Sequence, residues 1–272
     1  MMELLREMLS YPFIVRALTG GLLISLCASL LGVSLVLKRY SMIGDGLSHV
    51  SFGALSVAVA FGWAPLAVSI PVVAAAAVLL LRITGNGKIK SDAAIAMISA
   101  GSLAVGIIVT SLTTGMTTDV SSYMFGSILA MSREDVVLSA VLSLIVLGMF
   151  ILCYNKVFAV TFDESFARAT GVRASGYNTI LAVLTAVTIV LGMRMMGAML
   201  ISSLIIFPAL TSMRVFKSFS GVILSAGTVS VVCFFIGLVL SYVYSIPAGA
   251  SVVVVNMGAF GIFSVIQAVR RR

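Results

Sequence analysis

Long apolar runs, which charged residues interrupt only near their ends, dominate this chain. Runs of about 20 apolar residues cross a bilayer as helices, because a helix satisfies its own backbone hydrogen bonds where no water is present. Hydrophobic residues make up 61% of the 272 residues and charged residues only 10%, which is more apolar surface than a water-soluble domain can bury. The sequence therefore predicts an all-α, polytopic membrane helix bundle, with about eight to nine transmembrane helices in one domain over residues 1–272.

The candidate spans can be delimited by charged residues and turn signals. They cover residues 13–37, 43–61, 65–83, 93–112, 136–153, 177–192, 196–213, 221–244 and 250–269. The sixth and seventh runs are short, and only Arg194 and its neighbours separate them, in what we expect to be an outer loop. These two runs could therefore form one broken element.

Lysine and arginine residues indicate how the spans are oriented, because both are enriched in the short cytoplasmic loops of membrane proteins. With the C-terminus in the cytoplasm, most of the 17 basic residues fall in cytoplasmic loops, whereas the reverse orientation would place most of them outside. We therefore expect a multi-pass protein in a lipid bilayer with a cytoplasmic C-terminus. This topology explains why the chain is rich in basic residues, with a net charge of +8, and we expect no nucleic-acid partner.

The loop over residues 113–134, on the expected outer side, is too long for a tight turn. It contains an apolar patch at residues 123–131, which is too short to span a membrane. This patch could form a short helix at the outer surface.

The loop over residues 155–175, on the expected cytoplasmic side, carries helix signals. Thr161 and Asp163 are capping residues, a helical run follows them, and Gly171 can end it. This order predicts one short cytoplasmic helix near residues 161–172.

Asp45 is the acidic residue that falls within a predicted span, whereas the other acidic residues lie in loops or at span edges. Ionisable groups are costly inside a bilayer, so a residue of this kind is a candidate functional site. The single histidine, His49, follows four residues later, which on a helix places both side chains on one face about one turn apart. A helix counted from Arg39 would place His49 near the middle of the membrane and Asp45 closer to the helix start, so the two residues are a candidate pair.

An imidazole and a carboxylate are common ligands of divalent zinc, manganese and iron. Two ligands are too few for zinc, which normally takes four, so a complete site would need a second copy of the chain across a two-fold axis. Two other interpretations stay open from the residues alone. The pair could relay protons, or His49 could hydrogen-bond Asp45 to fix a helix contact.

Several catalytic motifs can be tested against the sequence. Residues 85–91 (GNGKIKS) are not a Walker A motif, because Arg82 stands in place of the first glycine and Ile89 in place of the final Ser or Thr. A single histidine excludes the HExxH motif, and no GxSxG-like context accompanies it. We therefore expect neither an enzyme nor a permanently bound cofactor.

Four patches resemble the membrane permease subunits of the bacterial ABC importers for zinc, manganese or iron. The first is residues 30–49 (LLGVSLVLKRYSMIGDGLSH), and the second is residues 121–135 (SSYMFGSILAMSRED). The third is residues 162–172 (FDESFARATGV), followed by residues 193–210 (MRMMGAMLISSLIIFPAL), and the fourth is residues 246–253 (IPAGASVV). Their order and spacing over most of the chain are specific to this family.

The resemblance implies a permease of the type II ABC importer kind in the bacterial cytoplasmic (inner) membrane. Its expected partners are a second copy of itself, a cytoplasmic ATP-binding subunit that hydrolyses ATP, and an extracytoplasmic metal-binding solute-binding protein. Asp45 and His49 match the family's metal-coordinating positions. The docking of the ATPase is expected at a coupling helix with these residues: Asp163, Glu164, Ala167 and Gly171.

The transported ion is expected to be manganese, zinc or iron. Zinc-type relatives can carry a further histidine where this chain has Ala100, which tilts the expectation toward manganese or iron. Two alternative functions stay open: a proton- or ion-coupled secondary transporter, and an ABC permease for a metal chelate.

Overall fold

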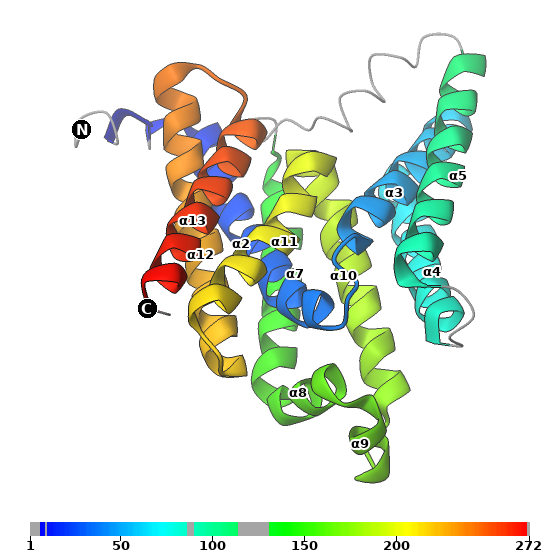
Figure 1. The fold of residues 1–272 in the computed structure, drawn as a ribbon. Helices are drawn as coiled ribbons and strands as arrows, with labels where there is room; N and C mark the ends of the chain where they lie inside the picture. The colour runs from blue at the N-terminus through cyan, green and yellow to red at the C-terminus, as the bar shows by residue number, and fades with distance from the viewer. Residues whose placement is uncertain (1–5, 9, 86–89, 114–130, 271–272) are drawn as a thin grey trace.

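The computed structural model describes residues 6–8, 10–85, 90–113 and 131–270 of the chain. Within these ranges, nine helices are long and apolar enough to cross a membrane (Figure 1). They are α2 (Pro12–Leu37), α3 (Ile43–Ala60), α4 (Pro65–Gly85), α5 (Ser91–Leu112), α7 (Arg133–Leu152), α10 (Ala174–Met196), α11 (Ala198–Val215), α12 (Phe219–Tyr244) and α13 (Ala248–Arg270). The prediction of a polytopic all-α bundle is confirmed, and each predicted span coincides with one of these helices within a few residues. The apolar patch at residues 123–131 lies outside the described residues.

The helices fall into two groups, and α10 contacts both of them. In Figure 1, α3, α4 and α5 stand together on one side, while α2 packs with α11, α12 and α13 on the other. The most buried spans are α2 and α3. In each of them, 72% of an apolar stretch of 18 residues is buried inside the protein, against 17% for α5 and 11% for α13. The peripheral helices therefore present their apolar faces to the membrane or to another protein chain.

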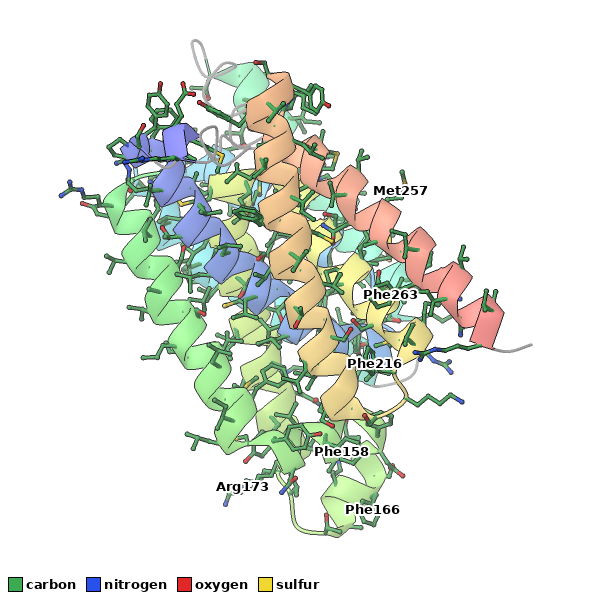
Figure 2. All side chains as sticks on the ribbon, turned by 90° about the vertical axis from the view of Figure 1, so that its left-hand side faces the viewer. Phe158, Phe166, Arg173, Phe216, Met257 and Phe263 are labelled. Carbon is green, nitrogen blue, oxygen red and sulfur yellow. The ribbon has the colours of Figure 1, made fainter. Side chains whose placement is uncertain are left out.

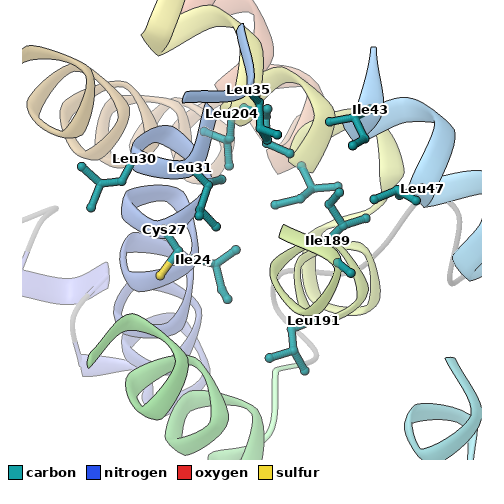
Figure 3. Packing of buried hydrophobic residues seen from close by; sticks show 14 of the residues in the cluster. Ile24, Cys27, Leu30, Leu31, Leu35, Ile43, Leu47, Ile189, Leu191 and Leu204 are labelled. Carbon is teal, nitrogen blue, oxygen red and sulfur yellow. The ribbon is translucent and has the colours of Figure 1, made fainter. Parts of the chain in front are cut away.

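The core lies where α2, α3, α10 and α11 meet. Figure 3 shows Leu31 of α2, Leu47 of α3, Ile189 of α10 and Leu204 of α11 directed into this region. All four side chains are at most 1% exposed. Close packing here holds α3 inside the bundle, although its sequence is less apolar than that of the other spans.

The short sixth and seventh spans are two helices with a sharp break between them. Gly197 separates α10 from α11 with a φ of 90°, a backbone conformation that glycine adopts without steric cost. Our expectation that Arg194 lies in a loop is wrong, because α10 continues through Arg194 to Met196.

Two short helices, α8 (Tyr154–Phe162) and α9 (Glu164–Ala169), lie together at the lower end of the bundle in Figure 1. We expected a single helix near residues 161–172, with Thr161 among its caps. Instead, Thr161 lies in the last turn of α8, and Asp163 alone caps α9 by accepting a hydrogen bond from the Phe166 N–H at 2.9 Å. The division arises because residues 154–162 form a helix of their own, which the sequence pattern does not distinguish from a loop.

Candidate metal site and docking helix

A tight turn leads the chain from α2 into α3. The Arg39 N–H donates to the Val36 carbonyl at 3.0 Å and the Tyr40 N–H donates to the Leu35 carbonyl at 2.9 Å, the two bonds of a Schellman motif. Arg39 has a φ of 64°, the left-handed conformation that glycine usually supplies at this point. The helix α3 begins directly after this turn, which places Asp45 in its first turn.

Small residues let α3 approach its neighbours closely. A Cβ atom on Gly46 would lie 2.5 Å from Cγ2 of Ile95 in α5, and one on Gly53 would lie 2.6 Å from the Ser102 carbonyl oxygen in the same helix. On another side, a Cβ on Gly44 would lie 3.1 Å from a side-chain atom of α11. The axis of α3 is therefore held between α5 and α11, which sets the direction of its polar face.

Asp45 and His49 lie one above the other on this face. His49 Nε2 is 3.7 Å from Asp45 Oδ2, longer than the 2.7–3.2 Å of an ordinary hydrogen bond. Nitrogen and oxygen ligands of one tetrahedral zinc ion, each about 2.1 Å from the metal, are themselves about 3.4 Å apart. The separation in the structure is therefore close to that of two ligands of one ion, and it gives no direct hydrogen bond to fix a helix contact.

The pair is incomplete as a metal site in one chain. Among the described residues, no group of three or more His, Cys, Asp or Glu side chains could hold a metal ion. The Asp45 side chain is 51% exposed and that of His49 is 22% exposed, although α3 is a central helix. A half-exposed carboxylate on a spanning helix is costly against hydrocarbon, so this face requires water or a second protein surface.

The helix α9 shows how the expected docking residues are arranged. Ala167 is fully buried against Val160 and Ala174, and Gly171 ends the segment with a φ of 83°. The large apolar residue that α9 presents outward is Phe166, which is 61% exposed at the tip of the protein (Figure 2). The sequence pattern does not single out Phe166. The available signal was an aromatic residue in a short helix that we expect to face water.

Glu164 faces the bundle rather than the tip. Its Oε2 accepts a hydrogen bond from Asn178 Nδ2 of α10 at 2.9 Å and lies 3.9 Å from Lys38 Nζ at the end of α2. Arg168, on α9 itself, lies 2.5 Å from Oε1. Burial by itself raises the pKa of the Glu164 carboxyl, but the hydrogen bonds from Asn178 and Arg168 and the charges of Lys38 and Arg168 outweigh it and lower this pKa.

An ion pair that the sequence does not indicate joins the start of α7 to the last turn of α10, at the ends of these helices away from α8 and α9. Asp135, 5% exposed, completes a capping box with Ser132 at the start of α7. Its Oδ1 is 3.3 Å from Nη1 of Arg194 in the last turn of α10. The sequence alone places Asp135 at a span edge and Arg194 in a loop. It does not indicate their contact, because residues distant in sequence share no spacing pattern.

Comparison with known proteins identifies the family. The family model "ABC 3 transport family" matches residues 10–267. The chain belongs to this family. A relative from Treponema pallidum, named "Probable metal transport system membrane protein", is 34% identical over 92% of this chain and 94% of its own length. A solved structure, "PsaBC from Streptococcus pneumoniae in complex with Fab", covers 96% of this chain and 94% of its own, with 27% identity and a TM-score of 0.84.

The names of other relatives concern different metals. A manganese transport system membrane protein of Halalkalibacterium halodurans is 26% identical over 94% of this chain and 88% of its own length. A high-affinity zinc uptake system membrane protein of Haemophilus influenzae is 27% identical over 92% of this chain and 96% of its own length. The resemblance to the permeases of zinc, manganese and iron ABC importers is therefore confirmed, and this ABC 3 chain is a multi-pass membrane protein.

Proposed function

We propose that this ABC 3 chain is the transmembrane permease subunit of an ABC importer that moves manganese, zinc or iron into the cytoplasm as a divalent ion. The observation that carries this proposal is the Asp45–His49 pair, with 3.7 Å between nitrogen and oxygen on the half-exposed face of a central helix. The names of the relatives support metal as the cargo. Residues 1–272 act as a single permease domain, and a separate chain hydrolyses ATP.

Two copies of the chain form the pathway. A two-fold axis beside α3 brings two carboxylates and two imidazoles together, which gives the four ligands of a complete site, two from each chain. The second chain also covers Asp45, which is 51% exposed in one chain. The ion binds with the imidazole neutral and the carboxylate ionised, so acid weakens its binding.

The distribution of the basic residues supports an orientation with α9 in the cytoplasm of the bacterial cell. There, α9 docks on the ATP-binding subunit through the exposed ring of Phe166, with Asp163 and Gly171 shaping its ends and Ala167 anchoring it to α8 and α10. A solute-binding protein delivers the ion at the opposite face. ATP-driven movement of α9 reorients the site between the two sides of the membrane.

The experiment is metal uptake by vesicles that contain the purified permease with its ATPase and its binding protein. Wild type and the double variant Asp45→Ala, His49→Ala are compared for Mn²⁺, Zn²⁺ and Fe²⁺. Loss of the ligands should reduce uptake by at least about tenfold. The matched control is Ser56→Ala on the same helix. The Ser56 hydroxyl donates to the Phe52 carbonyl of its own helix, and its loss should leave uptake within about twofold.

Each outcome separates the proposal from its alternatives. Uptake by the double variant equal to that of wild type, at equal expression, would show that Asp45 and His49 do not carry the ion. Uptake that an uncoupler abolishes and that persists without the ATPase would favour a proton-coupled transporter. Competition by a chelate rather than by the free ion would favour a chelate permease.

A further inference from the structure

Polar side chains from three helices meet at the carboxylate of Glu164. Asn178 of α10 bridges two of them, because its amide N–H donates to Glu164 and its carbonyl oxygen accepts from the ammonium group of Lys38. Lys38 Nζ also lies 3.9 Å from Glu164 Oε2, and Lys38 is the C-terminal cap of α2. We call Lys38, Asn178 and Glu164 the bridging cluster. It joins the docking helix α9 to the end of α2.

The bridging cluster is partly open to water. It lines a polar cavity of about 720 Å³. The side chain of Lys38 is 13% exposed and that of Glu164 is 37% exposed. Burial lowers the pKa of Lys38, and the charge of Glu164 opposes this shift. Ion pairs that water can reach contribute little to stability, so the cluster matters for the positions of its helices more than for holding the bundle together.

The turn that follows Lys38 is stiff. Its Schellman hydrogen bonds hold it to the last turn of α2. The Tyr40 hydroxyl lies 2.7 Å from the Thr84 hydroxyl of α4, and the Ser91 hydroxyl donates to the Arg39 carbonyl at 3.3 Å. The Ile43 N–H donates to the Tyr40 carbonyl at 3.0 Å, so this turn is bonded to the start of α3, and Asp45 lies in the first turn of that helix.

We propose that the bridging cluster transmits the movement of α9 to the α2–α3 turn and thereby sets the position of Asp45. Lys38, Asn178 and Glu164 are positioning residues, and they do not touch the ion. This inference rests on the proposed function, in which α9 is the part that the ATPase moves. Without the cluster, α9 still docks, because Phe166 is outside it and Ala167 keeps its packing against α8 and α10. Its movement would then reach α3 by helix packing alone, through α10 or through α8 and α2.

The test measures metal imported per ATP hydrolysed by the complete importer in vesicles. Lys38→Met keeps the approximate length of the side chain and removes the ammonium group, which donates to Asn178 and lies near the carboxylate of Glu164. This ratio should fall by about fivefold, which is the scale of one partly exposed ion pair, while ATP hydrolysis and the yield of the complex stay near wild type. Lys38→Arg, which keeps a donor and the charge, should restore most of the ratio.

The matched control is Lys156→Met, which removes a cation at the same end of the bundle. Lys156 lies over the ring of Tyr177 at 5.9 Å and belongs to α8. It should leave the ratio unchanged. A structural role for Lys38 would instead lower hydrolysis, yield and import together.

An unchanged ratio in Lys38→Met, or an equal fall in Lys156→Met, would overturn the relay while wild-type import still supports the proposed function. Failure of wild type to import metal with ATP would overturn both. If Lys38→Met does not assemble, Asn178→Ala breaks the same bridge from α10 and should give the same fall in the ratio. Failure of both variants to assemble would show that the cluster is structural and would overturn the proposal.

Discussion

Asp135 of α7 and Arg194 of α10 pair with 3.3 Å between Oδ1 and Nη1, and the Asp135 side chain is only 7% exposed. Removing one partner of a buried pair leaves an uncompensated charge, which costs more than the pair itself contributes. Arg194→Met should therefore lower the free energy of unfolding by about 2 kcal/mol, less than for a fully enclosed pair because Arg194 is partly exposed. Thermal unfolding in detergent measures this loss.

The double variant Asp135→Asn, Arg194→Met is the control for that prediction. The asparagine oxygen can still accept the Ser132 N–H bond of the capping box, and no buried charge remains. The double variant should recover most of the lost stability. A double variant less stable than Arg194→Met would contradict the interpretation that an unpaired carboxylate causes the loss.

The contact between α3 and α5 depends on a missing side chain at Gly53. A Cβ there would lie 2.6 Å from the Ser102 carbonyl oxygen, and backbone cannot move aside as a flexible side chain can. Gly53→Ala should destabilise the protein by about 1–3 kcal/mol through overpacking. In α5 itself, a Cβ on Gly101 would meet no atom of the described residues within 4 Å, so Gly101→Ala should be neutral or slightly stabilising. Equal unfolding temperatures for the two variants would show that α5 is free to shift.

The lowered pKa of Glu164 predicts how the stability of the folded protein depends on pH. Its pKa is lower in the folded chain than its ordinary value of 4.5, because its hydrogen bonds and cationic neighbours outweigh burial. The unfolded chain therefore takes up this proton first on acidification. The contribution of Glu164 is complete above its ordinary pKa and is lost as the pH falls through the folded-state pKa.

Wild type should consequently lose more thermal stability than Glu164→Gln between about pH 6 and about pH 3.5. Glu134→Gln, which changes an exposed carboxyl at the start of α7, is the control and should follow wild type. Parallel unfolding curves for wild type and Glu164→Gln would show that Glu164 is not stabilised as a carboxylate.

The exposed ring of Phe166 predicts where the ATPase binds. Buried aromatic anchors contribute much of the free energy of protein interfaces, so Phe166→Ala should reduce recovery of the ATPase with the tagged permease by about tenfold or more. Phe216→Ala removes a second exposed aromatic side chain, 42% exposed between α11 and α12, and should leave recovery unchanged. Equal recovery for both variants would place the docking surface elsewhere.

The sequence alone predicts the number and position of the spans, because a bilayer requires about 20 apolar residues in each helix. It also brings Asp45 and His49 to one face, since residues four apart on a helix are neighbours whatever surrounds them. The short helix α8 escaped prediction because its apolar residues lie outside the spans and follow no clear boundary.

Only the tertiary structure decides which side chains meet across helices. The separation of 3.7 Å between Asp45 and His49 depends on the rotamers that the packing of α3 allows. The inward direction of Glu164 and the outward direction of Phe166 depend on how α9 rests on α8 and α10. The pairing of Asp135 with Arg194 depends on the break at Gly197 and on the crossing of α7 with α10. The contacts of Glu164 with Lys38 and Asn178, and of Asp135 with Arg194, join residues far apart in the chain. Their energies therefore arise from packing in three dimensions, and no local spacing pattern predicts them.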